Sequence, residues 1–261
     1  MKSRSKGKSK DRLGNHQKSW LWGRHAVLEA LRAGSWEMQE LYLSSGLDDQ
    51  QMNLVQELAQ VRGVEPELVA PARIRELCHA GDHQGVLARM GVFPYADWNL
   101  MLGELTAGSF VLALDHLEDP HNLGTLIRSA EIFGVDAVVM PDKGQVGVTS
   151  AVARSSAGAV NRVPLVRIEN LREGILALKK IGLACVGASE KSSLFIDQFD
   201  LASGLVLVIG NEGRGLSTEV QDVCDECVAI PQMGEIGSLN AAAAGAIFFY
   251  EVSRQRRSRV G

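Results

Sequence analysis

Three segments of the chain carry polar residues that could do chemistry, and each begins in or just after a stretch predicted to be a buried strand. They span residues 115–134, 205–217 and 230–250. In open α/β sheets, ligands bind at the loops that follow the carboxyl ends of the strands. We therefore expect these polar residues to take part in a ligand site.

The first segment predicts a helix with one arginine turned away from the core. Asn122 is a favourable N-cap residue, with Pro120 just upstream. An apolar stripe follows at helical spacing, formed by Leu123, Leu126, Ile127, Ala130 and Phe133. At 100° per residue, Arg128 lies about 140° from Leu123. Arg128 therefore points to solvent or to a site, and the bland alternative is an ordinary solvated arginine.

The second segment is an apolar strand that runs into a glycine-rich turn. The turn contains Gly210, Asn211, Glu212 and Gly213. Such turns expose backbone N–H groups to a ligand, although a plain tight turn explains the glycines equally well. The GxxGxG spacing differs from the dinucleotide-binding GxGxxG, which argues against a nicotinamide-dependent oxidoreductase. No structural requirement explains the acidic Glu212.

The third segment joins a polar loop to a long helix. Ser238 or a neighbour can cap this helix, and residues 240–246 are nearly all small. Small faces let helices approach closely, often across a dimer. The alternative is a helix that simply propagates well, because alanine is the best helix former.

These segments require a parallel sheet to position them. The expected strands are 110–115, 137–140, 163–166, 183–188, 205–210 and 228–231, with helices between most of them and a last helix over about 239–255. A smaller α/β pattern covers residues 20–93, with strands near 40–44, 64–69 and 85–90 and helices near 48–62 and 71–78. We expect a basic disordered tail over 1–19, a linker over 94–108 that contains a short helix, and a larger domain over 109–261.

Composition limits the function classes. Apolar residues make up 46% of the 261, which is enough to build cores. The chain has no run of 18 apolar residues, and its basic N-terminus lacks the apolar segment of a signal peptide, so we expect a cytoplasmic protein. Cys78 and Cys185 are expected to be buried thiols. Cys224 and Cys227 lack a second ligand pair nearby, which argues against zinc.

Net charge is −4, but both ends are basic: residues 1–12 carry +5 and residues 252–261 carry +4. Basic ends on an acidic body suit loose contacts to phosphates. A purely solubilising role for the arginines near the C-terminus is equally acceptable.

Together the three polar segments resemble the motifs of the SpoU/TrmH family of RNA 2'-O-methyltransferases, within the SPOUT superfamily. The matching residues are Asn122 and Arg128, then Asn211, Glu212 and Gly213, then Ser238, Leu239 and Asn240. The resemblance covers about 109–252. One departure is Ala241-Ala242, where many members carry Val-Ser.

The resemblance implies an α/β fold with a trefoil knot near the C-terminus, a homodimer, and S-adenosylmethionine as cofactor, with no metal. The implied cofactor-binding residues are Gly210, Asn211, Gly213, Ile230, Gln232, Ser238 and Leu239. The implied catalytic residues are Arg128, Asn122, Glu212, Ser238 and Asn240. Arg128 is either the base that accepts the proton or a clamp on a phosphate.

The smaller domain resembles the ribosomal-protein-like substrate-binding domain of the rRNA-specific branch. The resemblance rests on Gly23-Arg-His-Ala-Val27 and His83-Gln-Gly-Val86. Members with this layout methylate a guanosine of 23S rRNA, so RNA is the expected partner. A tRNA ribose methyltransferase and a catalytically inactive RNA-binding or ribosome-assembly factor remain alternatives.

Overall fold

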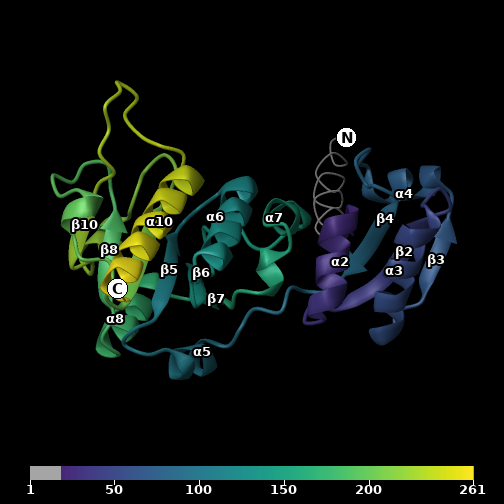
Figure 1. The fold of residues 1–261 in the computed structure, drawn as a ribbon, viewed down its shortest axis with the longest axis horizontal. Helices are drawn as coiled ribbons and strands as arrows, with labels where there is room; N and C mark the ends of the chain where they lie inside the picture. Colours follow the sequence, from purple (N-terminus) through teal and green to yellow (C-terminus); the bar gives the residue numbers. More distant parts are fainter. Residues whose placement is uncertain (1–18, 261) are drawn as a thin grey trace, which may run out of the picture. The chain divides into compact units, whose positions relative to one another are not determined.

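The structure is a computed structural model that describes residues 19–260. The predicted basic tail lies outside these residues, except for Ser19. The chain forms two compact units, and each is described by itself (Figure 1). The N-terminal unit comprises residues 1–94 and 148–161, and the C-terminal unit comprises residues 95–147 and 162–261.

The N-terminal unit is a four-stranded sheet with helices. Its elements are β1 (Trp20–Trp22), α2 (Arg24–Ala33), β2 (Met38–Ser44), α3 (Asp49–Val61), β3 (Pro66–Val69), α4 (Pro71–Cys78) and β4 (Val86–Met90). The strand order is β1-β4-β2-β3, and only β2 and β3 run parallel. Side chains such as Leu21, Leu31 and Ile74 are fully buried in this unit.

A segment from the middle of the chain belongs to this unit. It contains α7 (Ser150–Ser155) and the short 3-10 helix η1 (Ala159–Asn161). The Ser150 hydroxyl donates to the carbonyl of Trp20, and the Arg154 guanidinium lies 4.7 Å from the Trp22 ring centroid and pairs with Asp82. We expected this segment within the domain over 109–261, and nothing in its local pattern indicated these distant partners.

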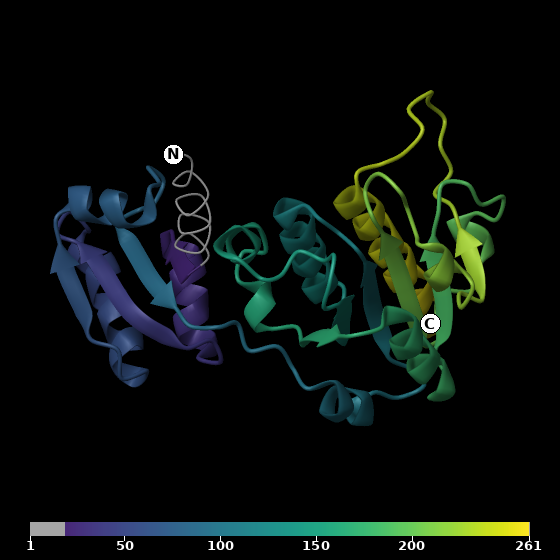
Figure 2. The ribbon, with the colours of Figure 1, turned by 180° about the vertical axis from the view of Figure 1, so that it is seen from behind.

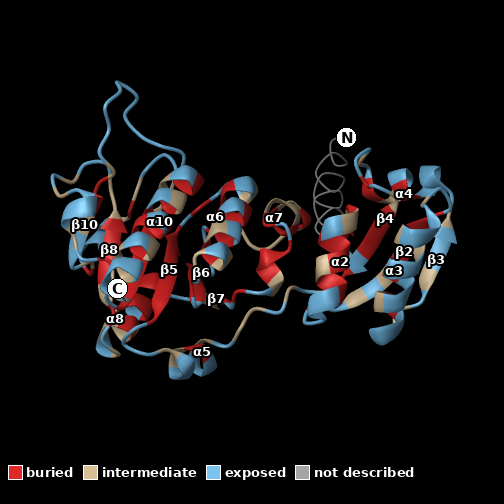
Figure 3. Cartoon of the chain, in the orientation of Figure 1, coloured by how far each residue is buried: buried red, intermediate tan, exposed pale blue. Residues whose placement is uncertain are grey.

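The C-terminal unit is a six-stranded parallel sheet covered on both faces. Its strands are β5 (Phe110–Asp115), β6 (Ala137–Pro141), β7 (Leu165–Ile168), β8 (Ala184–Ala188), β9 (Leu205–Gly210) and β10 (Glu226–Val228). Their order is β10-β8-β9-β5-β6-β7. The strands β5 and β6 are entirely buried and β9 nearly so (Figure 3), as their near-continuous apolar sequences predict.

Two layers of helices enclose this sheet. Here α6 (Pro120–Ile132) packs on α10 (Ala241–Val260), and Phe249 of α10 meets Phe110 of β5 with the ring centroids 5.8 Å apart. On the opposite face α8 (Leu171–Lys180) packs on β5, β6 and β8 and contacts α9 (Thr218–Gln221). Figure 2 shows the sheet from behind, with α10 on the far side of the strands. The helix α5 (Trp98–Glu104) contacts β7, and η2 (Ile196–Gln198) contacts α10.

The strand order places the polar segments at a topological switch point. From β5 the chain runs outward through β6 and β7, then returns to β8, and β9 inserts between β8 and β5. The carboxyl ends of β5 and β9 are therefore neighbours, with Asp115 opposite Gly210. Ligands of open α/β sheets bind at such a point.

Several element boundaries differ from the sequence prediction by a few residues. The helix α6 begins at Pro120 and is capped by Asp119 rather than by Asn122. Two further differences have a clear cause. The last strand was expected over 228–231, but β10 ends at Val228. The reason is that Ala229 leaves β8 and pairs with Phe195 instead. The last helix begins at Ala241 rather than near Leu239, because Asn240 caps it through its side chain.

The cysteines behave as reduced thiols. As predicted, Cys78 and Cys185 are buried. The Cys185 thiol lies 3.7 Å from that of Cys224, and this hydrogen bond together with burial raises the pKa of Cys185. Within residues 19–260, no group of three or more histidine, cysteine or acidic side chains is placed to hold a metal ion. Over the same residues, no helix is long and apolar enough to cross a membrane.

Two of the arginines near the C-terminus, Arg256 and Arg259, hold α10 to the rest of the unit. Arg259 pairs with Asp200 at 2.7 Å, whereas Arg254 pairs at 2.7 Å with Glu251 of the same helix. Arg256 donates to the carbonyls of Gly108 and Ser203. These contacts give the arginines a structural role that the charge pattern alone did not predict.

Candidate active site

A pocket opens at the carboxyl ends of β8, β9 and β10. It encloses about 820 Å³, a volume that includes the part open to solvent. The lining comes from four places in the sequence: residues 188–191, the turn 209–215, the loop 228–239 and the first turns of α10. We call it the β9 pocket.

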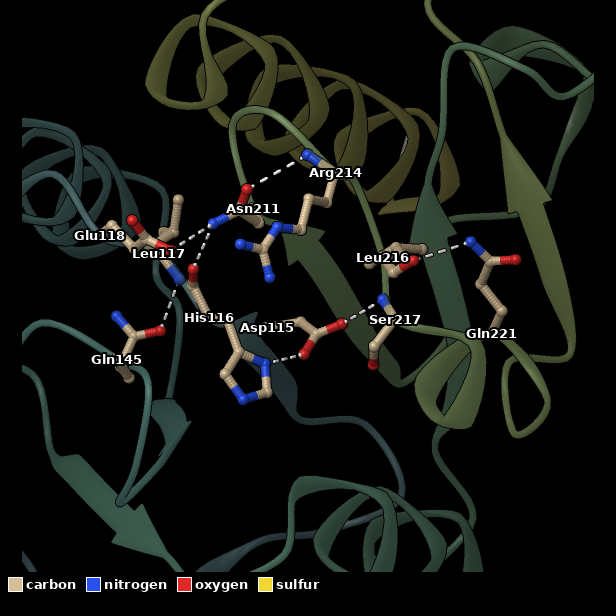
Figure 4. A network of polar contacts seen from close by, with 10 residues as sticks. All are labelled: Asp115, His116, Leu117, Glu118, Gln145, Asn211, Arg214, Leu216, Ser217 and Gln221. Atoms are coloured by element: carbon tan, nitrogen blue, oxygen red, sulfur yellow. Dashed lines mark hydrogen bonds and ion pairs between the residues drawn. The ribbon is translucent and has the colours of Figure 1, made fainter.

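The turn after β9 is held in shape by Asn211. Its Oδ1 accepts from the backbone N–H of Arg214 at 3.1 Å, and its Nδ2 donates to the carbonyl of His116 at 2.8 Å (Figure 4). The same Oδ1 also accepts from the backbone N–H of Gly213 at 3.0 Å. Gly210 leaves no room for a side chain, because a Cβ there would lie 2.4 Å from the carbonyl carbon of Gly215. The predicted glycine-rich turn is therefore closed by backbone contact, and Gly210 and Gly213 line the pocket.

A chain of hydrogen bonds joins the three polar segments. Asn122 Nδ2 donates to Glu212 Oε1 at 3.0 Å, and Asn240 Nδ2 donates to Asn122 Oδ1 at 2.9 Å. Asn122, on α6, is only 8% exposed. Asn240 Oδ1 also accepts from the backbone N–H of Ala242 at 2.9 Å, which caps α10. Asn122 of the first segment thus links Glu212 of the second segment to Asn240 of the third.

Arg128 lies apart from this chain. It is exposed on α6, as the helical spacing predicts, and its side chain makes no hydrogen bond or ion pair with any residue that the structure describes. It does not line the β9 pocket. Its guanidinium is thus available for an external anion.

The other predicted site residues divide into two groups. Those predicted to bind the cofactor all line the β9 pocket: Gly210, Asn211, Gly213, Ile230, Gln232, Ser238 and Leu239. Glu212 lines the pocket as well. Asn122 and Asn240 do not line it: Asn122 donates to Glu212, and Asn240 donates to Asn122.

The sequence analysis missed two parts of the site. Ser189, Glu190 and Lys191 line the pocket directly after β8. Their position after a predicted strand was the available signal. Asp115 was also missed: its buried carboxylate accepts from the backbone N–H of Ser217 at 2.6 Å and lies 2.6 Å from His116 Nδ1 (Figure 4). These bonds join the end of β5 to the turn after β9.

The pocket suits a ligand with both apolar and polar parts. Ile209, Leu239 and Phe248 offer apolar walls, and the backbone of the turn offers polar groups. The same pocket carries two carboxylates, Glu190 and Glu212, and two cationic side chains, Lys191 and Arg214, which suit a ligand with charges of both signs. A nucleoside joined to a sulfonium and an amino-acid group matches this combination.

Comparison with known proteins agrees with this geometry. The sequence model described as SpoU rRNA Methylase family matches residues 109–250, and that described as RNA 2'-O ribose methyltransferase substrate binding matches residues 20–96. A Staphylococcus aureus protein whose name places it in the TrmH family of tRNA/rRNA methyltransferases is 37% identical over 237 residues, covering 90% of this chain and 95% of that protein.

Solved structures show the same similarity over nearly the whole chain. The SpoU methyltransferase AviRb from Streptomyces viridochromogenes, in complex with the cofactor AdoMet, aligns with a TM-score of 0.80 and 25% identity, covering 96% of this chain and 94% of that one. An AdoMet-bound rRNA methyltransferase from Sinorhizobium meliloti aligns with a TM-score of 0.77 and 26% identity, covering 94% and 90%. The chain therefore belongs to the SpoU/TrmH family of RNA ribose 2'-O-methyltransferases, which use S-adenosylmethionine as the methyl donor.

Proposed function

We propose that this protein methylates the ribose 2'-hydroxyl of a guanosine in 23S rRNA and acts as a homodimer. The observation that carries the reaction type is the chain Asn240–Asn122–Glu212 at the edge of the β9 pocket, which unites all three family motifs. Residues 20–96 match a substrate-binding domain for RNA.

The extent of structural similarity favours rRNA over tRNA. The rRNA methyltransferase from Sinorhizobium meliloti aligns over 94% of this chain. A TrmH/SpoU tRNA modifying enzyme from A. aeolicus aligns over 62%, and a structure concerning methylation of C/U34 on tRNA aligns over 59%. The alignment with the rRNA enzyme thus includes both the N-terminal and the C-terminal unit of this chain. The alignments with the two tRNA-related structures are too short to include both units. A tRNA substrate is the second candidate, because the name of the Staphylococcus aureus relative includes it.

The donor binds in the β9 pocket in this proposal. Backbone groups near Gly210, Ile230 and Leu239 hold its adenine and ribose, while Asn211 and Gly213 keep the turn in shape. When bound, the donor supplies an electrophilic methyl group on sulfur. The knot that the family resemblance implies stays a prediction.

The remaining residues act on the acceptor. A ribose hydroxyl is a poor nucleophile at neutral pH, so it needs orientation and removal of its proton, worth about 10²–10⁴-fold when a positioned base accepts it. Glu212 is held by Asn122, and Ser238 lies at the pocket, so both can orient the hydroxyl. An arginine side chain is already protonated at neutral pH, so it has no free electron pair to accept a proton. We therefore assign Arg128 to the adjacent phosphate, where its charge lowers the pKa of the hydroxyl, and the hydroxyl proton passes to water.

Exposed apolar side chains support the homodimer. On α10, Ile247 is 39% exposed and Tyr250 is 53% exposed. In the loop before it, Met233 and Ile236 are fully or largely exposed. A surface of this composition is typical of an interface.

Ribose-methylation mapping tests the substrate. Ribosomal RNA and tRNA from cells with and without this protein are compared at every nucleotide. We expect one 23S rRNA guanosine to lose its 2'-O-methyl group in cells that lack the protein. Loss of a methyl group from tRNA alone would transfer the proposal to the second candidate.

A further inference from the structure

The N-terminal unit contains a second cavity, unrelated to the β9 pocket. It encloses about 900 Å³, including the part open to solvent, and every lining residue belongs to this unit. The lining consists of Arg24, Ser44, Gly46, Leu47, Asp48, Gln51, Pro71, His83, Gln84 and Gly85. We call it the His83 cavity, and its lining includes Arg24 from the first and His83, Gln84 and Gly85 from the second of the two motifs on which the resemblance of this unit rests.

Two buried side chains keep hydrogen-bonding capacity for a ligand there. His83 is only 7% exposed, and its Nδ1 accepts from the backbone N–H of Gly85 at 3.0 Å. This bond leaves the proton on Nε2, which has no partner among the residues that the structure describes. Ser44 is 4% exposed, and its Oγ accepts from Gly46 N–H at 3.2 Å, which leaves its own hydroxyl proton unused within the same residues. Both side chains thus offer a donor to a ligand in the cavity.

The charges around the cavity favour an anion. Arg24 lines the cavity, and Arg75 lies close enough for its positive charge to lower the pKa of His83. Neither guanidinium forms an ion pair with any described residue. The N-terminal ends of α2, α3 and α4 also face it, through Arg24, Asp48 and Pro71. Helix N-termini carry partial positive charge. The carboxylate of Asp48 opposes an anion, but its Oδ1 is occupied by the N–H of Gln51 at 2.8 Å.

The cavity is held open by the turn before β4. Gln84 Oε1 accepts from the backbone N–H of Arg24 at 3.0 Å, which ties the start of α2 to this turn. At Gly85 a Cβ would lie 2.9 Å from Leu47 Cδ2, so a larger residue would push into the wall. Arg24 and His83, distant in sequence, are thereby fixed against the same space.

We propose that the His83 cavity binds one nucleotide of the RNA substrate, with its phosphate between Arg24 and His83. The exposed carboxylate of Asp82, the residue before His83, is engaged elsewhere, since it accepts from Trp22 Nε1 at 2.9 Å and pairs with Arg154. His83 acts as a neutral donor, because burial and the charge of Arg75 lower its pKa. This inference rests on the proposed function, in which RNA is the substrate, and it names where the N-terminal unit holds that RNA.

The test compares RNA binding by the full-length protein and four variants, with a 23S rRNA transcript as the probe. We expect Arg24→Ala to weaken binding about tenfold. The slope of log K against the logarithm of salt concentration should become less steep by about one unit, the contribution of one phosphate contact. The control is Arg32→Ala, which removes the same charge from the other end of α2, where Arg32 pairs with Glu29. It should change affinity less than twofold.

Two substitutions of His83 separate ligand binding from folding. Asn at position 83 can still accept from Gly85 N–H but lacks the distal donor, so His83→Asn should keep the melting temperature and weaken RNA binding about threefold to tenfold. Gln at position 83 places an N–H donor near the position of Nε2 but loses the bond to Gly85. His83→Gln should therefore melt earlier and bind RNA nearly as well as wild type.

The outcomes distinguish this inference from the proposed function. Wild-type affinity in both Arg24→Ala and His83→Asn, with RNA binding and methylation intact, would overturn the His83 cavity alone. Failure of the wild-type protein to bind or methylate any RNA would instead overturn the proposed function. Inorganic phosphate at millimolar concentration is added in parallel. Equal displacement of RNA from wild type and Arg24→Ala would also count against the cavity.

Discussion

At the scale of single residues, Asn240 uses the two atoms of its amide for different purposes. Its Oδ1 caps α10, and its Nδ2 donates to Asn122. The Asn240→Asp variant keeps the cap but loses the donor, so stability should hold while methyl transfer falls at least tenfold. Asn240→Ala loses both and should also cost about 1 kcal/mol of stability. Thermal denaturation and initial rates check this, and full activity of Asn240→Asp would disprove the role of the hydrogen bond.

Arg128 is the residue whose loss should separate binding from chemistry. It is exposed on α6 and lies outside the β9 pocket. Arg128→Ala should therefore abolish methyl transfer while the affinity for S-adenosylmethionine, measured by calorimetry, changes less than about twofold. Arg172→Ala on α8, a half-buried arginine that pairs with Glu173 at 3.0 Å, is the control for loss of an arginine elsewhere in the unit and should remain active. Near-normal turnover by Arg128→Ala would remove Arg128 from the site.

The sequence predicted much of this site, for different reasons at different residues. Helical spacing alone placed Arg128 on the exposed face of its helix. Family resemblance supplied the pocket residues, and the structure places all seven cofactor-binding predictions on one pocket. Lys191 and Asp115 were missed, because their roles depend on which strands are neighbours in the sheet. Strand order is a property of the whole chain that a local pattern does not contain.

At the scale of elements, close packing of α6 on α10 depends on Gly245. A Cβ there would lie 2.2 Å from Leu126 Cδ2. Gly245→Ala should destabilise the protein by about 1–3 kcal/mol, and Leu126→Ala by about 2–5 kcal/mol. The double variant should lose less stability than the sum of the two single losses, because the methyl group of alanine at position 245 occupies part of the space that Leu126 leaves.

Denaturant unfolding measures this coupling. Gly103→Ala is the control, since a Cβ at that helical position meets no atom within 4 Å, and it should be neutral or slightly stabilising. Strict additivity of Gly245→Ala and Leu126→Ala would show that the two residues do not constrain each other.

The elements that the sequence predicted best are the most buried. The bounds of β5 and β9 agree with the prediction, and both are continuously apolar up to their last residue. The end of β10 was predicted wrongly, because the switch of Ala229 to Phe195 depends on a distant segment. The three-residue strand β1 was not predicted as a strand, since Trp20–Trp22 is too short for alternation to be visible.

At the scale of the whole molecule, the two units are not two consecutive pieces of chain. Residues 148–161 belong to the N-terminal unit, where Val152 is fully buried. We expect a fragment of residues 95–261 to fold and to bind S-adenosylmethionine within about twofold of the full chain. Amide hydrogens of residues 148–161 should exchange rapidly in the fragment while those of β5 and β9 stay protected.

Hydrogen exchange followed by mass spectrometry measures this difference, with the full-length protein as the control. Equal protection of residues 148–161 in both proteins would show that this segment is stable without the rest of the N-terminal unit. The fragment should also lose most of its activity on 23S rRNA, because single-stranded loops must be selected by contacts wider than one nucleotide.

The most direct test of the account is the chemical position of the transferred methyl group. Purified protein is incubated with S-adenosylmethionine carrying a labelled methyl group and with a 23S rRNA transcript, and the digested nucleosides are identified by mass spectrometry. The account predicts a single labelled product, 2'-O-methylguanosine, which is absent when Arg128→Ala replaces the wild-type protein. Label on a nucleobase, or no transfer to the transcript, its assembling subunit or any tRNA, would contradict it.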